Sequence, residues 1–110
     1  MGRQFNSTDI QIFNKLAPEE KGNIKSPMGH QYPYILRPIS HRIAKSSEDF
    51  KKRLSFLSND ELNYLVDLIL EDKEDIRSLD PEDTDALIEL FKDRLSEKKA
   101  KDVKLHIGIV

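Results

Sequence analysis

The residues with the clearest chemical potential lie in one short acidic stretch, EDKEDIRSLDPEDTD (71–85). Eight of its fifteen side chains are carboxylates, and only Lys73 and Arg77 oppose them. Carboxylate oxygens are the usual ligands of calcium and magnesium, but the standard calcium loop also needs a Gly at its sixth position and a Glu at its twelfth. No register of the stretch meets this pattern. An irregular divalent-cation site at 71–85 is therefore the third of three functional interpretations.

The leading interpretation is a surface that binds another protein. Acidic side chains recur every four residues along two predicted helices, so each helix carries an acidic stripe. Like charges at this spacing destabilise a helix by about 0.2–0.5 kcal/mol per pair. Because no interaction within either predicted helix offsets this repulsion, we expect a protein with a basic surface to bind the acidic stripes. The predicted partner-binding residues are Asp67, Glu71, Asp75, Asp85, Glu89 and Asp93.

The acidic residues of the two halves of 71–85 lie at opposite ends of predicted helices. Asp80, Glu82 and Asp83 stand at a predicted helix N-terminus, where the helix dipole favours negative charge by about 0.3–1 kcal/mol each. The acids of 71–75 fall at a predicted helix C-terminus, where the same dipole disfavours them. We therefore expect a cation to compensate the first half, whether it comes from the chain's own basic parts, from a partner or from solvent.

The alternative interpretation is a nucleic-acid-associated protein. Charge is segregated along the chain, with a net +5 over 1–57, −10 over 58–97 and +3 over 98–110. Basic side chains between 37 and 53 could contact phosphates. The predicted helix 80–99 cannot act as a recognition helix, since its acids would be repelled by the nucleic acid backbone. The residues of this alternative are Arg37, Arg42, Lys45, Lys51, Lys52 and Arg53.

The sequence gives no support to an enzyme. It has no cysteine, and its four glycines form neither of the phosphate-binding loop patterns. His30, His41 and His106 lack the spacing of a metal-binding or catalytic motif. No apolar run approaches the roughly 20 residues of a membrane span. We therefore expect a non-enzymatic cytoplasmic protein with no cofactor, no metal and no membrane contact.

Three strongly patterned helices are expected to position these charges. Each has a start signal followed by apolar residues at helical spacing. Ser46 is a plausible cap for the first, Ser58 and Glu61 form a capping box at the second, and Asp80 precedes Pro81 at the third. These helices are predicted over 46–57, 58–75 and 80–99.

The two ends of the chain are predicted to differ from this helical middle. The segment 1–30 contains one short, weakly patterned helix and then a run of prolines and glycines, so we expect it to be poorly ordered or loosely packed. The stretch VKLHIGIV (103–110) alternates apolar and polar side chains, which is the period of a strand. Its partner would be 31–37 of the same chain or the same strand of a second subunit. The sequence thus predicts a small α+β domain over 31–110 that is mainly α and ends in a strand.

Overall fold

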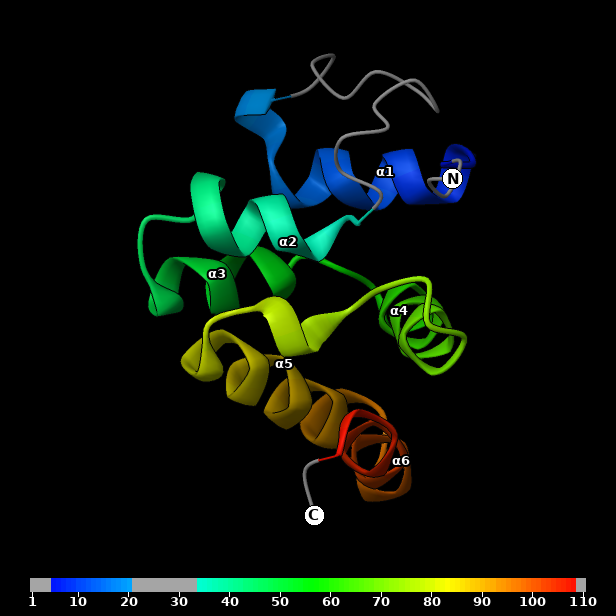
Figure 1. Cartoon of the computed structure of the whole chain (residues 1–110). Coiled ribbons are helices and arrows are strands. Elements are labelled where there is room, and N and C mark those ends of the chain that lie inside the picture. Colours follow the sequence, from blue (N-terminus) through cyan, green and yellow to red (C-terminus); the bar gives the residue numbers. More distant parts are fainter. Residues whose placement is uncertain (1–4, 21–33, 109–110) are drawn as a thin grey trace.

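Helices form the whole regular structure of the residues described here, 5–20 and 34–108 of the computed structural model (Figure 1). α1 (Ser7–Leu16) leads into a 3₁₀ turn (Pro18–Glu20), and α2 (Leu36–Pro38) runs directly into a π-helical turn (Ile39–Ile43). Next come α3 (Ser47–Leu54), α4 (Asn59–Leu70), a second 3₁₀ turn (Ile76–Ser78), α5 (Pro81–Arg94) and α6 (Glu97–Ile107). No helix within these ranges is long and apolar enough to cross a lipid bilayer.

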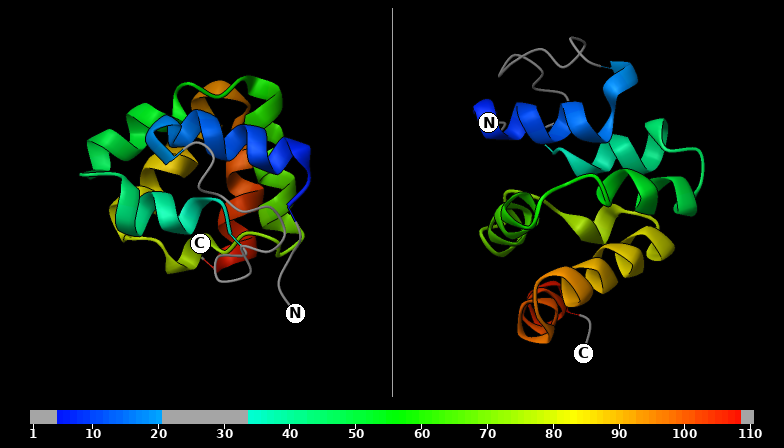
Figure 2. Two further views of the ribbon diagram at one scale, coloured as in Figure 1. Left: turned by 90° about the horizontal axis from the view of Figure 1, so that it is seen from above. Right: turned by 180° about the vertical axis from the view of Figure 1, so that it is seen from behind.

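The six helices enclose one hydrophobic core. α1 lies at one end of the molecule and packs on α3, and α5 and α6 pack on each other at the opposite end, where α5 lies across the view and α6 is seen nearly end-on (Figure 1, Figure 2). Between these ends, α3 packs on α5 and α4 packs on α6. The largest fully buried side chains come from five of the helices: Ile12, Leu16, Leu36, Phe50, Leu54, Leu62, Leu65 and Phe91.

The predicted α+β fold is wrong, because the C-terminal segment is a helix. Glu97–Ile107 forms α6, and no strand occurs in residues 5–20 or 34–108. Val103 and Ile107 are four residues apart, so they fit an alternating pattern and a helical one equally well. Leu105 distinguishes the two patterns. A strand would bury Leu105 on the same side as Val103 and Ile107, but Leu105 is 53 % exposed. The fold is all-α.

Local signals explain why α5 and α6 are two helices rather than one helix over 80–99. α5 ends at Arg94, and Ser96 then caps α6 by accepting a hydrogen bond from the Lys99 amide at 3.1 Å. At the other end, Gly108 has φ +87°, the left-handed conformation that glycine adopts readily after a helix.

The predicted pairing of 103–110 with 31–37 fails for the same reason. Residues 31–33 lie outside the described part of the chain, and Ile35 and Leu36 are buried at the start of α2. A dimer through strand 103–110 has no structural basis either, because Val103 faces the core from α6.

The three central helices are confirmed, and so are two of their start signals. Ser46 accepts a hydrogen bond from the Asp49 amide at 3.0 Å. Ser58 and Glu61 form the reciprocal capping box, with distances of 3.1 and 2.8 Å. Asp80 occupies the cap position of α5 but makes no side-chain cap hydrogen bond. The helices are shorter than predicted at their C-terminal ends, since α4 stops at Leu70 and α5 at Arg94.

The segment 1–30, which we expected to be loosely packed, is described only at residues 5–20. There α1 buries Ile12, Phe13 and Leu16 in the core. The remainder of the predicted segment lies outside the described residues.

Candidate functional site

The acidic stripe of α5 is exposed along its whole length. Asp85, Glu89 and Asp93 follow one another at a spacing of four residues, and all three side chains are exposed. Opposite them on the helix, Leu87 and Phe91 are buried in the core, which fixes the stripe on the outer side. Within the described residues, no hydrogen bond or ion pair reaches these three carboxylates. Nothing in the described part of the fold therefore offsets their mutual repulsion.

The acidic stripe of α4 is largely engaged by its own neighbourhood. Glu71 lies 3.2 Å from the ammonium of Lys73. Asp75 caps the second 3₁₀ turn, accepting hydrogen bonds from the Arg77 amide at 3.0 Å and from Arg77 Nε at 3.1 Å. Asp67 alone is exposed without such a contact among the residues that the structure describes.

The acids at the C-terminal end of α4 have structural partners that the sequence does not reveal. Glu74 is only 3 % exposed and accepts hydrogen bonds from the backbone amides of Ile35 (2.7 Å) and Leu36 (3.1 Å). These amides open α2, where the cap residue Ile35 has no side-chain oxygen of its own. Asp72 adopts φ +61° and its carboxylate lies 2.8 Å from His106 Nε2. The charges of Glu74 and Asp72 are unfavourable at the C-terminus of α4, but each makes a contact elsewhere, Glu74 with α2 and Asp72 with α6.

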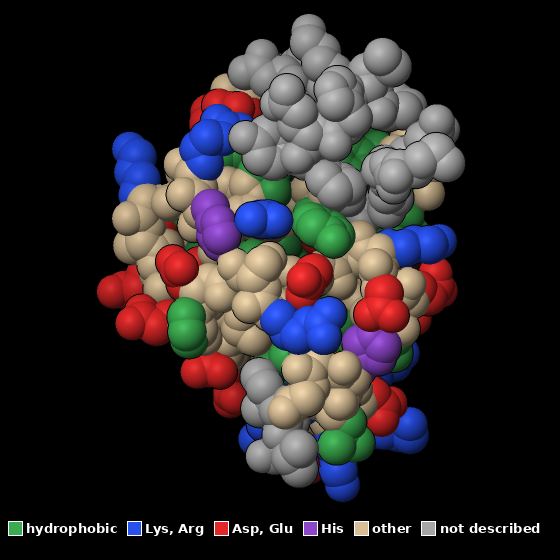
Figure 3. Space-filling view, in the orientation of Figure 1, with side chains coloured by type: hydrophobic (Ala, Val, Ile, Leu, Met, Phe, Trp, Pro, Cys, Tyr) green, Lys and Arg blue, Asp and Glu red, His purple; other side chains and the backbone are tan. Residues whose placement is uncertain are grey.

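The structure does not join the two stripes into one face. α4 packs mainly against α6, whereas α5 packs against α6 and α3. In Figure 1 α4 is seen nearly end-on, while α5 lies across the view below it. In the space-filling view, acidic side chains gather along the lower left edge, over α3 and α5 (Figure 3). Of the six predicted partner-binding residues, those on α5 form the coherent exposed set.

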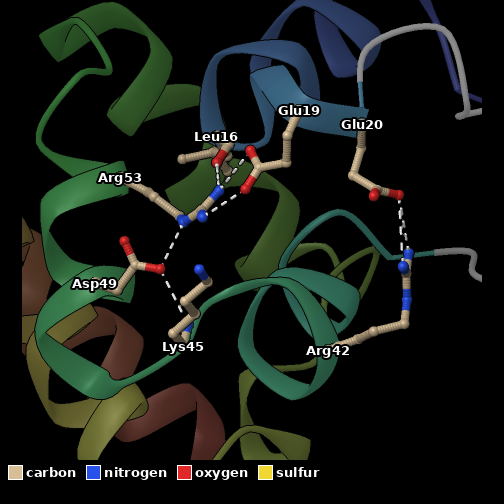
Figure 4. A network of polar contacts seen from close by, with 7 residues as sticks. All are labelled: Leu16, Glu19, Glu20, Arg42, Lys45, Asp49 and Arg53. Atoms are coloured by element: carbon tan, nitrogen blue, oxygen red, sulfur yellow. Dashed lines mark hydrogen bonds and ion pairs between the residues drawn. The ribbon is translucent and has the colours of Figure 1, made fainter.

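The basic residues of the nucleic-acid alternative fall into two groups, those that form ion pairs within the fold and those that are exposed. Arg53 is partly buried against α1, where it donates to the Leu16 carbonyl (2.8 Å) and forms a two-point contact with Glu19 (3.0 and 2.6 Å) (Figure 4). Arg42 pairs with Glu20 at 3.4 Å. Both arginines are thus occupied within the fold. The remaining four are exposed: Arg37, Lys45, Lys51 and Lys52.

The contacts of Arg53 change the ionisation of its neighbours. The hydrogen bonds from Arg53 lower the pKa of the Glu19 carboxyl below its ordinary value. A hydrogen bond from the Lys45 amide (3.0 Å), together with one from Arg53, lowers the pKa of Asp49. Glu19 raises the pKa of Arg53 in turn. This cluster joins the end of α1 to α3, so its role is structural.

Glu61 is an acid whose pKa is strongly lowered by its contacts. Burial raises the pKa of its carboxyl, but hydrogen bonds from Lys15 (2.8 Å), the Ser58 amide (2.8 Å) and Gln11 (3.0 Å) outweigh burial and bring the pKa down to about 2. Glu61 therefore stays ionised and joins α1 to the start of α4.

The described ranges contain no cluster of three or more His, Asp or Glu side chains suited to hold a metal ion. His41 Nε2 lies 2.7 Å from the Ser78 carbonyl and His106 lies against Asp72, so neither histidine contacts a nucleophile. His30 lies outside the described residues.

One basic surface is absent from the predicted site residues, because a strand over 103–110 does not place the lysines of this segment on one side of a helix. A shallow hollow of about 550 Å³ lies along α5 and α6. Four lysines line it, and the spacing of three of them along one helix was the available signal. Its lining residues are Lys92, Glu97, Lys98, Ala100, Lys101 and Lys104.

No protein-family model, no curated protein and no solved structure matches this chain. Any functional assignment therefore depends on the geometry described above.

Proposed function

We propose that the protein is a non-enzymatic interaction module that binds a basic protein segment along α5. The observation that carries this proposal is the exposed stripe of Asp85, Glu89 and Asp93, which has no internal partner among the described residues. The proposal assigns no catalytic residue and no cofactor. It places the protein in the cytoplasm, for which the absence of cysteine is the support.

The stripe is suited to a basic segment for electrostatic reasons. Each of its two neighbouring pairs opposes folding by about 0.2–0.5 kcal/mol. A bound cation placed between two carboxylates removes this repulsion and adds attraction of its own. Because the stripe is exposed along the outer side of α5, an extended or helical basic segment can contact its carboxylates together. Such a contact favours fast association and weakens with salt.

The nucleic-acid alternative is not favoured by any specific contact. Two of its six residues, Arg42 and Arg53, already pair with Glu20 and Glu19.

A defined basic ligand tests the proposal. We would titrate the isotope-labelled protein with a helical peptide that carries Lys at every fourth position and follow the amide chemical shifts at low salt. The shifts are expected to concentrate on Pro81–Arg94. The triple variant Asp85→Asn, Glu89→Gln, Asp93→Asn is expected to bind at least tenfold more weakly.

A matched control separates the site from overall charge. The triple variant Asp60→Asn, Asp67→Asn, Glu71→Gln removes the same three charges from exposed positions on α4. We expect less than threefold weakening in this control. Equal losses in the two variants would mean that the peptide responds only to net charge, and the proposal would be wrong.

A further inference from the structure

The hollow between α5 and α6 is positively charged. Four lysines and one acid, Glu97, line it, which gives the lining a net charge of +3. All five of these charged residues are exposed. Figure 3 shows basic side chains at the lower end of the molecule, where Figure 1 places α6. The hollow is therefore a cationic surface that is open to solvent.

Two helices contribute the cations of this lysine hollow. Lys101 and Lys104 are three residues apart, so they lie about one turn from each other on one side of α6. Lys92 reaches the same hollow from the last turn of α5. Because the lysines come from both helices, a ligand in the hollow can contact α5 and α6 together.

Most of this positive charge is available to a ligand. Lys92, Lys101 and Lys104 make no ion pair or hydrogen bond within the part of the chain that the structure describes. Lys98 pairs with Asp102 at 3.0 Å, but the contact is exposed and such contacts contribute little. Glu97, the acid of the lining, stands in the first turn of α6, where the helix dipole favours its charge. The lysine hollow thus keeps three cations without an internal partner in the described residues.

The lining favours phosphate over carboxylate. All four of its cations are ammonium groups, and none is a guanidinium. A carboxylate is matched best by the planar two-point fork of arginine, whereas lysine binds a phosphate as a point charge. The volume of the hollow, about 550 Å³, also lies in the range of small-molecule sites, roughly 300–1,000 Å³. A compact ligand with several phosphate groups fits both the charge and the size.

Acids on α5 favour a compact ligand over a long one. Glu89 and Asp93 are exposed and lie on either side of Lys92 in the sequence. A long polyanion such as nucleic acid that continued along α5 would approach these carboxylates, which repel phosphate. A ligand that ends within the lysine hollow avoids this repulsion.

We propose that the lysine hollow binds a compact ligand that carries two or more phosphate groups. Lys101 and Lys104 contact one phosphate from α6, and Lys92 contacts a second from α5. The ligand is a free polyphosphorylated molecule or the headgroup of a phosphorylated lipid, since both present the same chemistry. The exposed Leu105 follows Lys104 directly and would contact acyl chains only in the second case. This surface is separate from the α5 stripe, so the inference goes beyond the proposed function.

Titration with tripolyphosphate at low salt, followed by amide chemical shifts, tests the site. The largest shifts on α6 are expected over residues 97–104. The variant Lys101→Gln, Lys104→Gln should bind about tenfold or more weakly, because two charge-assisted contacts are lost. The matched control Lys51→Gln, Lys52→Gln removes two charges from exposed positions on α3 and should weaken binding by less than about twofold. Circular dichroism checks that both variants keep the fold.

The choice of anion tests the chemistry of the lysine hollow. Mellitate, a compact ring that carries only carboxylates, should bind about fivefold or more weakly than tripolyphosphate. Equal binding of the two anions would overturn the assignment of phosphate. Equal losses in the two lysine variants, or the absence of shifts over 97–104, would overturn the site itself.

Vesicles distinguish the two sources of phosphate. We would measure sedimentation of the protein with phosphatidylcholine vesicles that do or do not contain phosphatidylinositol bisphosphate. A lipid headgroup predicts sedimentation only with the phosphorylated lipid and its loss in Leu105→Ser, while tripolyphosphate binding by this variant is unchanged. A free ligand predicts tripolyphosphate binding without sedimentation. Failure of both tripolyphosphate and the phosphorylated vesicles to bind would overturn the inference.

Discussion

Removal of the Glu74 carboxylate should destabilise the protein strongly, although Glu74 belongs to an acidic stretch that looks like surface. Its two oxygens accept hydrogen bonds from the Ile35 and Leu36 amides, at 2.7 and 3.1 Å, in a buried environment. A hydrogen bond to a charged group contributes about 1.5–3 kcal/mol, and a buried amide left without an acceptor costs about 1–3 kcal/mol. Glu74→Ala should therefore lower the free energy of unfolding by about 3–5 kcal/mol.

Urea denaturation followed by circular dichroism measures this loss. With a slope of about 1–3 kcal/mol/M, the midpoint should fall by roughly 1–5 M while the slope stays unchanged. Glu74→Gln keeps one carbonyl acceptor but places an amide donor against the other backbone amide, so it should lose about half as much. Glu71→Gln, three residues earlier and exposed, is the control and should change stability by less than about 0.5 kcal/mol. A loss below about 1 kcal/mol for Glu74→Ala would show that the cap of α2 does not depend on this carboxylate.

Three further changes test other contacts of the fold by the same denaturation assay. Because the folded pKa of Glu61 is depressed to about 2 from 4.5, its contribution of about 3 kcal/mol is present above pH 5 and is lost as pH falls toward 2. Glu61→Gln should flatten this part of the pH profile, and an unchanged profile would contradict the assignment. Arg53→Ala should cost about 1–3 kcal/mol, since it removes a partly buried guanidinium that donates to the Leu16 carbonyl; a loss no larger than that of Lys52→Ala would contradict this. Glu89→Lys should raise stability by about 0.3–1 kcal/mol because it turns two repulsive pairs into attractive ones, and a loss of stability would refute the repulsion on α5.

The helical middle of the fold could be predicted from the sequence because its signals are local. The capping box of Ser58 and Glu61 and the proline after Asp80 mark helix starts without reference to distant residues. The C-terminal strand was wrong because an alternating pattern over so few residues also fits a helix. The cap at Ser96 was the local sign of a new helix, and the long helix expected over 80–99 obscured it.

The candidate site could be predicted only as a set of charges. Whether a carboxylate is available depends on what the fold brings to it, and those partners are distant in sequence. Glu74 meets amides nearly forty residues away, at Ile35 and Leu36. Asp85 and Glu89, with the same side-chain chemistry, meet no partner in the described residues. The sequence shows no difference between these two situations.

The attachment of α1 has a consequence for how the molecule opens. The hydrogen bonds that tie α1 to α3 and α4 in the described residues all use a side chain, as between Lys15 and Glu61 or Tyr64 and Asp9. α5 and α6, by contrast, are neighbours in sequence and pack directly on each other. α1 is thus suited to detach as a cooperative unit while α5 and α6 stay folded. Its amide protons would then exchange with solvent through a partial opening, and those of α5 and α6 only through global unfolding.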